Sequence, residues 1–125
     1  MKAPQRRAIA AFAACITGNC SRGALIDDEN MLPILLKIKK DKDQILVADQ
    51  SENIIMIAKQ RLLKWTIYDE RIARFIDLES SGNDFKGFDY DSSQYFTLQL
   101  SEDKICIYDY ETDDYHYFHM QKKKR

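Results

Sequence analysis

Glycine, proline and cysteine are all scarce in this chain. Its 125 residues include four glycines, two prolines and three cysteines. Three cysteines cannot form a complete disulfide framework, which excludes a secreted disulfide scaffold and favours reduced thiols in a cytoplasmic protein. With four glycines, the glycine-rich loops that cradle phosphates are not expected. No apolar run approaches the length of about 18–20 residues that spans a bilayer.

Motifs that name a reaction are absent as well. The sequence contains no P-loop, dinucleotide fingerprint, Gly-x-Ser-x-Gly elbow or His-Glu-x-x-His pair. The formal net charge of −1 excludes a uniformly basic nucleic-acid binder. Hydrophobic residues make up 45% and charged residues 31% of the chain, a composition typical of one globular domain. We predict a single α+β domain over residues 1–121 and a basic tail at 122–125, without enzymatic activity, cofactor, metal, or direct contact with nucleic acid or membrane.

The start of the chain has the pattern of an amphipathic helix. Ile9, Phe12 and Ile16 recur at helical spacing, and Pro4 suits a first turn. A basic start followed by an apolar run over residues 8–14 is also typical of a short targeting segment. That run is short and consists mostly of alanine. We therefore favour the helix and keep the targeting segment as the alternative.

A hairpin is predicted next. Residues 34–40 and 43–49 are expected to pair across a tight turn, with Ile38 opposite Ile45, because this register gathers four apolar side chains on one face.

The following stretch is predicted to be mainly helical. The segment that begins at Asp49 resembles a helix start, with a capping acceptor and a carboxylate three residues later. Apolar residues then recur at helical spacing, which favours a helix over residues 51–65 and a further short one around 72–76. Two short strands, around 54–58 and 63–68, are the competing interpretation.

Residues 84–120 are predicted to form an antiparallel meander. A turn at 102–103 places Leu98 opposite Ile107, and the next turn places Ile107 opposite Phe118. Both pairings send the apolar side chains to one face, which would comprise Phe96, Leu98, Leu100, Ile105, Ile107, Phe118 and Met120. The fold class expected is therefore an N-terminal helix and a mainly helical middle packed with a C-terminal antiparallel sheet.

The other face of this meander carries the strongest functional signal. Six of the seven tyrosines and nine carboxylates lie within 84–120, opposed by two lysines, so this segment has a net charge of −7. Exposed tyrosine is enriched in interface hot spots, and dense carboxylates steer a basic partner. The hypothesis is a bacterial, non-enzymatic binding protein of the immunity-protein, antitoxin or inhibitor type. Its predicted contact residues are Tyr90, Tyr95, Tyr108, Tyr110, Tyr115, Tyr117, Asp89, Asp91, Asp109, Glu111, Asp113 and Asp114.

Several alternatives use the same segment. The tyrosines and carboxylates could instead hold a sugar or a heterocycle, or could pair two copies of the chain as a homodimer. Cys106 is expected opposite His119, the minimum for an activated thiol, but no third group orients the base. Cys15 and Cys20 with the two histidines are poorly spaced for zinc. A weak echo between residues 88–96 and 108–118 is interpreted as two copies of one hairpin edge.

Overall fold

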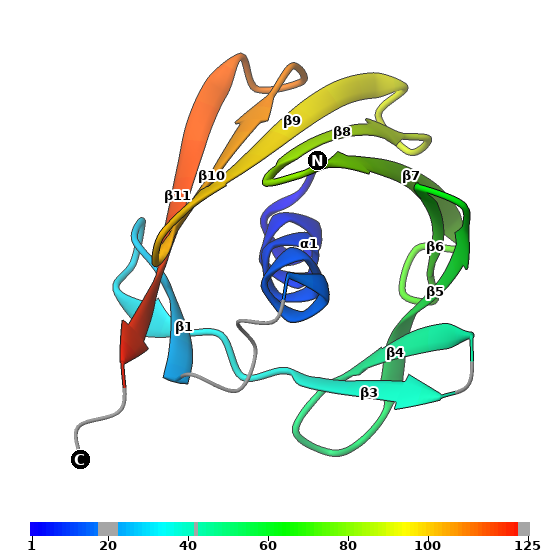
Figure 1. The fold of residues 1–125 in the computed structure, drawn as a ribbon, viewed down its shortest axis with the longest axis horizontal. Helices are drawn as coiled ribbons and strands as arrows, with labels where there is room; N and C mark the ends of the chain where they lie inside the picture. Colours follow the sequence, from blue (N-terminus) through cyan, green and yellow to red (C-terminus); the bar gives the residue numbers. More distant parts are fainter. Residues whose placement is uncertain (18–22, 42, 123–125) are drawn as a thin grey trace.

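The computed structural model describes residues 1–17, 23–41 and 43–122. In these ranges an antiparallel sheet of eleven strands curls around the helix α1 (Ala3–Ile16), seen end-on at the centre of Figure 1. The strand order is β2-β1-β11-β10-β9-β8-β7-β6-β5-β4-β3, so β1 returns to pair with β11, and β2 and β3 form the two edges. The strands are β1 (Gly23–Asp27), β2 (Leu32–Pro33), β3 (Lys37–Asp41), β4 (Gln44–Ala48), β5 (Ile54–Arg61), β6 (Lys64–Asp69), β7 (Arg74–Ser81), β8 (Asp84–Asp89), β9 (Gln94–Ser101), β10 (Lys104–Asp109) and β11 (Asp114–Lys122).

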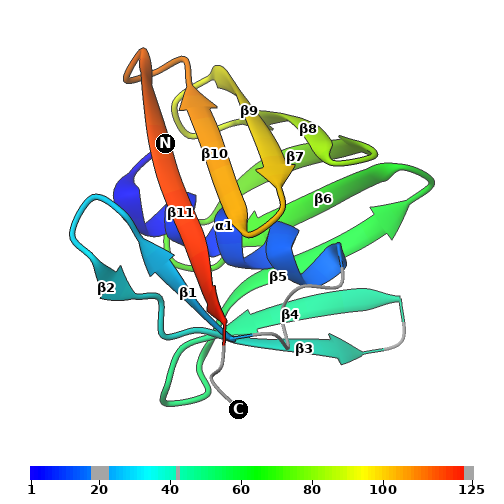
Figure 2. The same cartoon turned by 60° about the vertical axis from the view of Figure 1, so that its left-hand side comes forward.

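The predicted N-terminal helix is confirmed, and it forms the centre of the core. Pro4 lies in its first turn, where a missing N–H costs nothing. Ala8, Ile9 and Phe12 are at most 1% exposed, and the Phe12 ring meets Trp65 of β6 edge-on at 5.1 Å. Figure 2 shows α1 between β10–β11 on one side and β5 on the other. The many alanines keep the helix thin, so the sheet can close around it on several sides.

The mainly helical middle predicted from the sequence is wrong. Within residues 51–65, β5 begins at Ile54 and ends at Arg61, and β6 begins at Lys64 after a turn, while the segment 72–76 lies in a turn and in β7. The competing two-strand interpretation describes this stretch correctly. Leu62, which the helical pattern counted as part of an apolar face, is 90% exposed in the turn between β5 and β6. The apolar spacing therefore matched a helix by coincidence.

The expected helix start at Asp49 is also a turn. Its Oδ1 accepts the N–H groups of Ser51 at 2.9 Å and Asn53 at 3.0 Å. A short acceptor of this kind caps a helix or closes a turn with the same chemistry, so the residue type could not distinguish the two.

A strict period of 20 residues organises the sheet from β5 onward. Strands β5, β7 and β9 each have eight residues, strands β6, β8 and β10 each have six, and each series is offset by 20 residues. The pairing register recurs as well, since Met56 faces Asp69, Ile76 faces Asp89 and Phe96 faces Asp109. The echo seen in the sequence is therefore part of a longer series of hairpins and not two copies of one edge.

The meander over 84–120 is antiparallel as predicted, but one of its registers is shifted by two residues. Leu98 does face Ile107, whereas Phe118 faces Ile105 rather than Ile107. The hairpin of β3 and β4 shows the same shift, with Ile38 facing Val47. A shift of two keeps every side chain on its predicted face, and all seven residues expected on the apolar face are buried.

The strands β6, β8 and β10 each end with an aspartate that points into the molecule. Asp69, Asp89 and Asp109 are at most 1% exposed, and the Oδ1 of each accepts the N–H two residues later at 2.9–3.1 Å. At Asp109, the Met1 ammonium donates to Oδ2 at 2.6 Å, and the Arg6 Nη1 lies 3.6 Å from the same atom. The sheet therefore holds the first turn of α1 by its positive charges.

Candidate binding surface

The outer face of the sheet carries a band of aromatic side chains that follows the 20-residue period. Tyr68, Phe88 and Tyr108 occupy the same repeat position on β6, β8 and β10. Each packs against the aromatic ring directly opposite on the next strand, with ring centroids 4.8–4.9 Å apart. These cross-strand partners are Phe75, Tyr95 and Tyr115.

Most of the predicted tyrosines are exposed on this outer face. Tyr90, Tyr95, Tyr110, Tyr115 and Tyr117 are 49–64% exposed, and Tyr108 is half-buried beneath the rings of Tyr110 and Tyr115. Because α1 packs on the opposite, inner face, no helix in the described ranges covers these rings. We refer to these six tyrosines, with Phe88, as the tyrosine face.

The predicted carboxylates separate into two groups. Asp91, Glu111, Asp113 and Asp114 are exposed in or next to the turns that border the tyrosine face. Of these, Glu111 accepts the Met1 ammonium at 2.8 Å, and Asp114 faces Asp109 in the register and lies on the pocket side of β11. Asp89 and Asp109 were predicted as contact residues, and this is corrected by the structure: both are 1% exposed and point inward. They belong to the turns and to the attachment of α1, because strand alternation sends them to the face opposite the tyrosines.

Two carboxylates fix tyrosine hydroxyl groups. The Tyr90 hydroxyl donates to Asp77 Oδ2 at 2.8 Å, and the Tyr108 hydroxyl donates to Asp113 Oδ1. The hydrogen bond to Asp113 raises the pKa of Tyr108 to about 12, and the bond to Asp77 raises the pKa of Tyr90. Both hydroxyls therefore remain protonated donors at neutral pH. Asp77 was missed in the sequence because it precedes the acidic segment, and only the 20-residue period would have placed it here.

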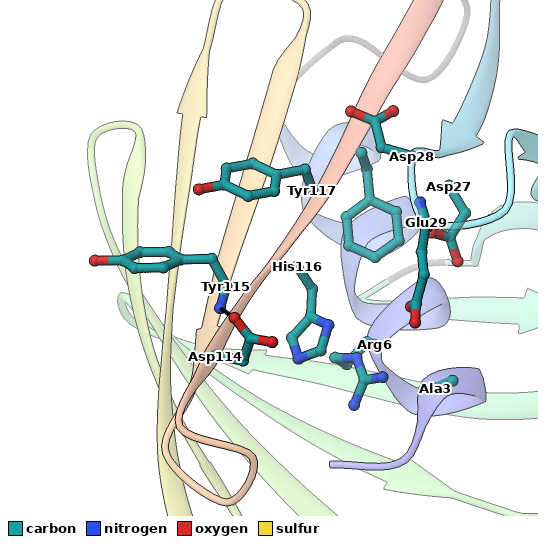
Figure 3. Close-up of a pocket in the computed structure, with 10 residues that line it drawn as sticks. Ala3, Arg6, Asp27, Asp28, Glu29, Asp114, Tyr115, His116 and Tyr117 are labelled. Atoms are coloured by element: carbon teal, nitrogen blue, oxygen red, sulfur yellow. Dashed lines mark hydrogen bonds between the residues drawn. The ribbon is translucent and has the colours of Figure 1, made fainter.

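A small pocket lies at one end of β11, between this strand, β1 and the first turn of α1. Its volume is about 270 Å³, and Figure 3 shows His116 and Arg6 close together inside it. Desolvation by burial and the charge of Arg6 lower the pKa of His116. The His116 Nε2 lies 3.1 Å from the Thr112 Oγ1. Tyr115 and Tyr117 line the same pocket, so it adjoins the tyrosine face.

The predicted thiol–imidazole pair does not form. Cys106 faces Tyr117, whereas His119 faces Lys104 and its Nδ1 contacts Asp28 Oδ1. Burial raises the pKa of the Cys106 thiol, which is the opposite of activation.

The weaker metal hypothesis gains no support either. Cys20 lies outside the described residues, and no group of three His, Cys, Asp or Glu side chains suited to a metal occurs among the residues that are described. Of the predicted basic tail, residues 123–125 are likewise outside the described ranges. Over the described part of the chain, no helix has the length and apolar character needed to cross a membrane.

The molecule is thus defined as a curled antiparallel sheet of repeated hairpins around one helix, with an acidic aromatic outer surface at its C-terminal end. Comparison of the chain with protein-family models, curated proteins and solved structures finds no match.

Proposed function

We propose that this chain is a non-enzymatic, cytoplasmic protein-binding module whose tyrosine face captures a basic protein. The observation that carries the proposal is that five half-exposed tyrosines lie together on the outer side of the sheet, while four exposed carboxylates lie in or next to the two turns that border them. Tyrosine offers a large, rigid contact area with a polar tip, which is why it is enriched in interface hot spots. The rings are also held against one another, so little side-chain entropy remains to be lost on binding.

The charge of this surface favours a partner of positive charge. The segment 84–120 carries a net charge of −7, and the inward Asp89 is removed from water while Asp109 is compensated by the Met1 ammonium and Arg6. The exposed carboxylates Asp91, Asp113 and Asp114 therefore set the field in front of the tyrosines. A field of this sign accelerates encounter with a basic protein and repels nucleic acid.

The test uses two double charge reversals that change the net charge equally. Asp91→Lys with Asp114→Lys alters the turns that border the tyrosine face, whereas Asp84→Lys with Glu102→Lys alters exposed positions at the opposite end of the sheet, at the start of β8 and in the turn between β9 and β10. Proteins captured from a host lysate at low salt by the wild-type chain are first identified by mass. Association with the purified partner is then measured on a biosensor.

We expect the first double variant to slow association by about tenfold or more at low salt, and the second to change it far less. Tyr110→Ala should instead speed dissociation, because it removes buried contact area rather than long-range charge. Equal effects of the two double variants on the captured proteins would show that net charge alone, and not the tyrosine face, governs binding. Failure of the wild-type chain to retain any basic protein would also contradict the proposal.

A further inference from the structure

One ring pair in the tyrosine face differs from all the others. Tyr115 and Tyr117 stand two residues apart on β11 with their planes only 19° from parallel and their centroids 6.1 Å apart. The remaining ring pairs among the described residues meet at 58–83° and at 4.8–5.1 Å, with one ring directed at the other. Figure 3 shows the two nearly parallel rings projecting side by side from β11, away from the pocket. They are 55% and 53% exposed, so both rings are accessible to solvent.

The spacing of the strand explains this arrangement. Side chains at i and i+2 leave a strand on the same face about 6.6–6.8 Å apart. A flat group that stacks on two rings at once needs roughly 7 Å, which is two carbon–carbon contacts of about 3.5 Å. The centroid distance of 6.1 Å is an upper limit on the separation of the two ring planes, so the rings of Tyr115 and Tyr117 would have to part by at least about 1 Å. Because Tyr115 packs against Tyr108 at 4.8 Å, that movement falls to the ring of Tyr117, which is 53% exposed and can rotate about its side-chain bonds.

The neighbours of the two rings select for positive charge. Asp114 precedes the pair on β11, and Asp28 lies beside Tyr117, since the Asp28 N–H donates to the Tyr117 carbonyl at 3.0 Å. Figure 3 draws both carboxyl groups near the strand from which the rings project, with Asp114 next to His116 on the pocket side of β11. His119 shares the charge of Asp28, whereas Asp114 is bonded only through the Tyr115 N–H at 2.8 Å among the described contacts. A phosphate-bearing heterocycle is therefore disfavoured.

We propose that Tyr115 and Tyr117 form a slot for the planar guanidinium group of an arginine on the basic partner. This inference rests on the proposed function. Guanidinium is flat, always charged and weakly hydrated, so it stacks between rings and leaves its N–H groups at its edge for the carboxylates. A lysine ammonium is not flat and is strongly hydrated, so it gains less from the same slot.

The experiment compares two synthetic peptides of equal length and charge, one with five arginines and one with five lysines separated by glycines. Their affinities for the full chain are measured by calorimetry, and the tyrosine ring protons are followed by NMR. We expect the arginine peptide to bind about three- to tenfold more tightly and to shift the ring signals of Tyr115 and Tyr117 selectively.

The matched variants are Tyr117→Ala, Tyr117→Phe and Tyr95→Ala. Tyr95 is 64% exposed and belongs to the same face, but its ring meets Phe88 at 69° and has no parallel neighbour. Tyr117→Ala should abolish the preference for arginine, while Tyr117→Phe and Tyr95→Ala should retain it. All three positions are exposed, so circular dichroism and urea unfolding can confirm that the fold is intact.

The outcomes separate this inference from the proposed function. If both peptides bind equally and Tyr117→Ala acts no more strongly than Tyr95→Ala, the slot is refuted but an acidic binding face remains. If neither peptide binds in low salt, the proposed function fails together with the slot. Selective ring shifts with an uncharged nucleoside equal to those with the arginine peptide would overturn the assignment to a cation.

Discussion

The hairpin of β6 and β7 and the hairpin of β10 and β11 have the same backbone pairing but differ in the charge of their turns. Their residues correspond at an offset of 40, and their registers are identical. Three positions around the turn change charge or gain it, since Arg71, Ala73 and Arg74 correspond to Glu111, Asp113 and Asp114. Asp77 corresponds to Tyr117, so the hairpin of β6 and β7 has no counterpart of the parallel ring pair.

The inner positions of the same two hairpins hardly differ in character. Trp65 and Ile67 correspond to Ile105 and Ile107, and all four are at most 7% exposed. The inward aspartate also recurs. The apolar inner positions therefore keep their character between repeats, while the residues in and next to the turn change their charge and, at Arg71 and Glu111, their contacts with the start of the chain.

The largest effect should come from the inward aspartate, whose charged partners differ between repeats. Asp69 is bonded by Arg71 from its own turn, which is one-third exposed, whereas Asp109 holds the buried Met1 ammonium and faces Arg6 of α1. Asp109→Asn removes the nearest carboxylate from the Met1 ammonium and leaves it with Glu111 at 2.8 Å and Asp89 at 3.9 Å, so we expect a loss of about 2–3 kcal/mol in the free energy of unfolding. Asp69→Asn should cost about 1–2 kcal/mol, because Arg71 can turn to water.

Urea unfolding followed by the fluorescence of Trp65, which is 7% exposed beside Phe12, measures both values. Equal losses for the two variants would show that the attachment of α1 adds nothing at Asp109. The pKa of the Met1 amino group supports the expected difference: burial, the largest single effect, lowers it, but the hydrogen bonds to Asp109 and Glu111 together raise it above its ordinary value.

The next effect concerns a compensating pair in the core. Ile67 faces Ile76 in the hairpin of β6 and β7, whereas Gly87 faces Phe96 in the hairpin of β8 and β9. A Cβ atom at Gly87 would lie 2.1 Å from the Phe96 ring. We expect Gly87→Ala to destabilise the fold by about 1–3 kcal/mol through overpacking.

The double variant Gly87→Ile with Phe96→Ile copies the pair of the preceding hairpin and tests this explanation. It should be closer to the wild type in urea unfolding than Gly87→Ile alone, because the smaller opposite residue makes room for the new side chain. If the double variant loses more free energy of unfolding than the two single variants lose together, the repeats are not interchangeable at this position.

The sequence alone identified α1, the C-terminal meander and the face on which its side chains lie. These were predictable because period-2 alternation over β9 and β10 is regular, and because a register error of two residues leaves faces unchanged. The middle failed since Leu62 and Trp65 continued a helical spacing across a turn that no glycine marked. The inward Asp89 and Asp109 were placed in the binding face because composition counts charges without their direction.

The smallest expected effect concerns the turn between β5 and β6, which was not predicted from the sequence. The turns before β6, β8 and β10 each place one residue in the left-handed region, and these residues are Leu62, Gly82 and Glu102, with φ of 59°, 65° and 57°. Only glycine adopts this region without steric cost.

Leu62 is 90% exposed and loses no packing when truncated, so Leu62→Gly should stabilise the fold by about 0.5–1 kcal/mol. A Cβ at Gly82 would meet nothing within 4 Å, so Gly82→Ala should cost a similar amount through its backbone alone. Urea midpoints that move in opposite directions would support this comparison, and a loss of stability in Leu62→Gly would refute it. The scarcity of glycine would then reflect strain that the chain tolerates at its turns, because the packing of each hairpin against its neighbours and α1 outweighs it.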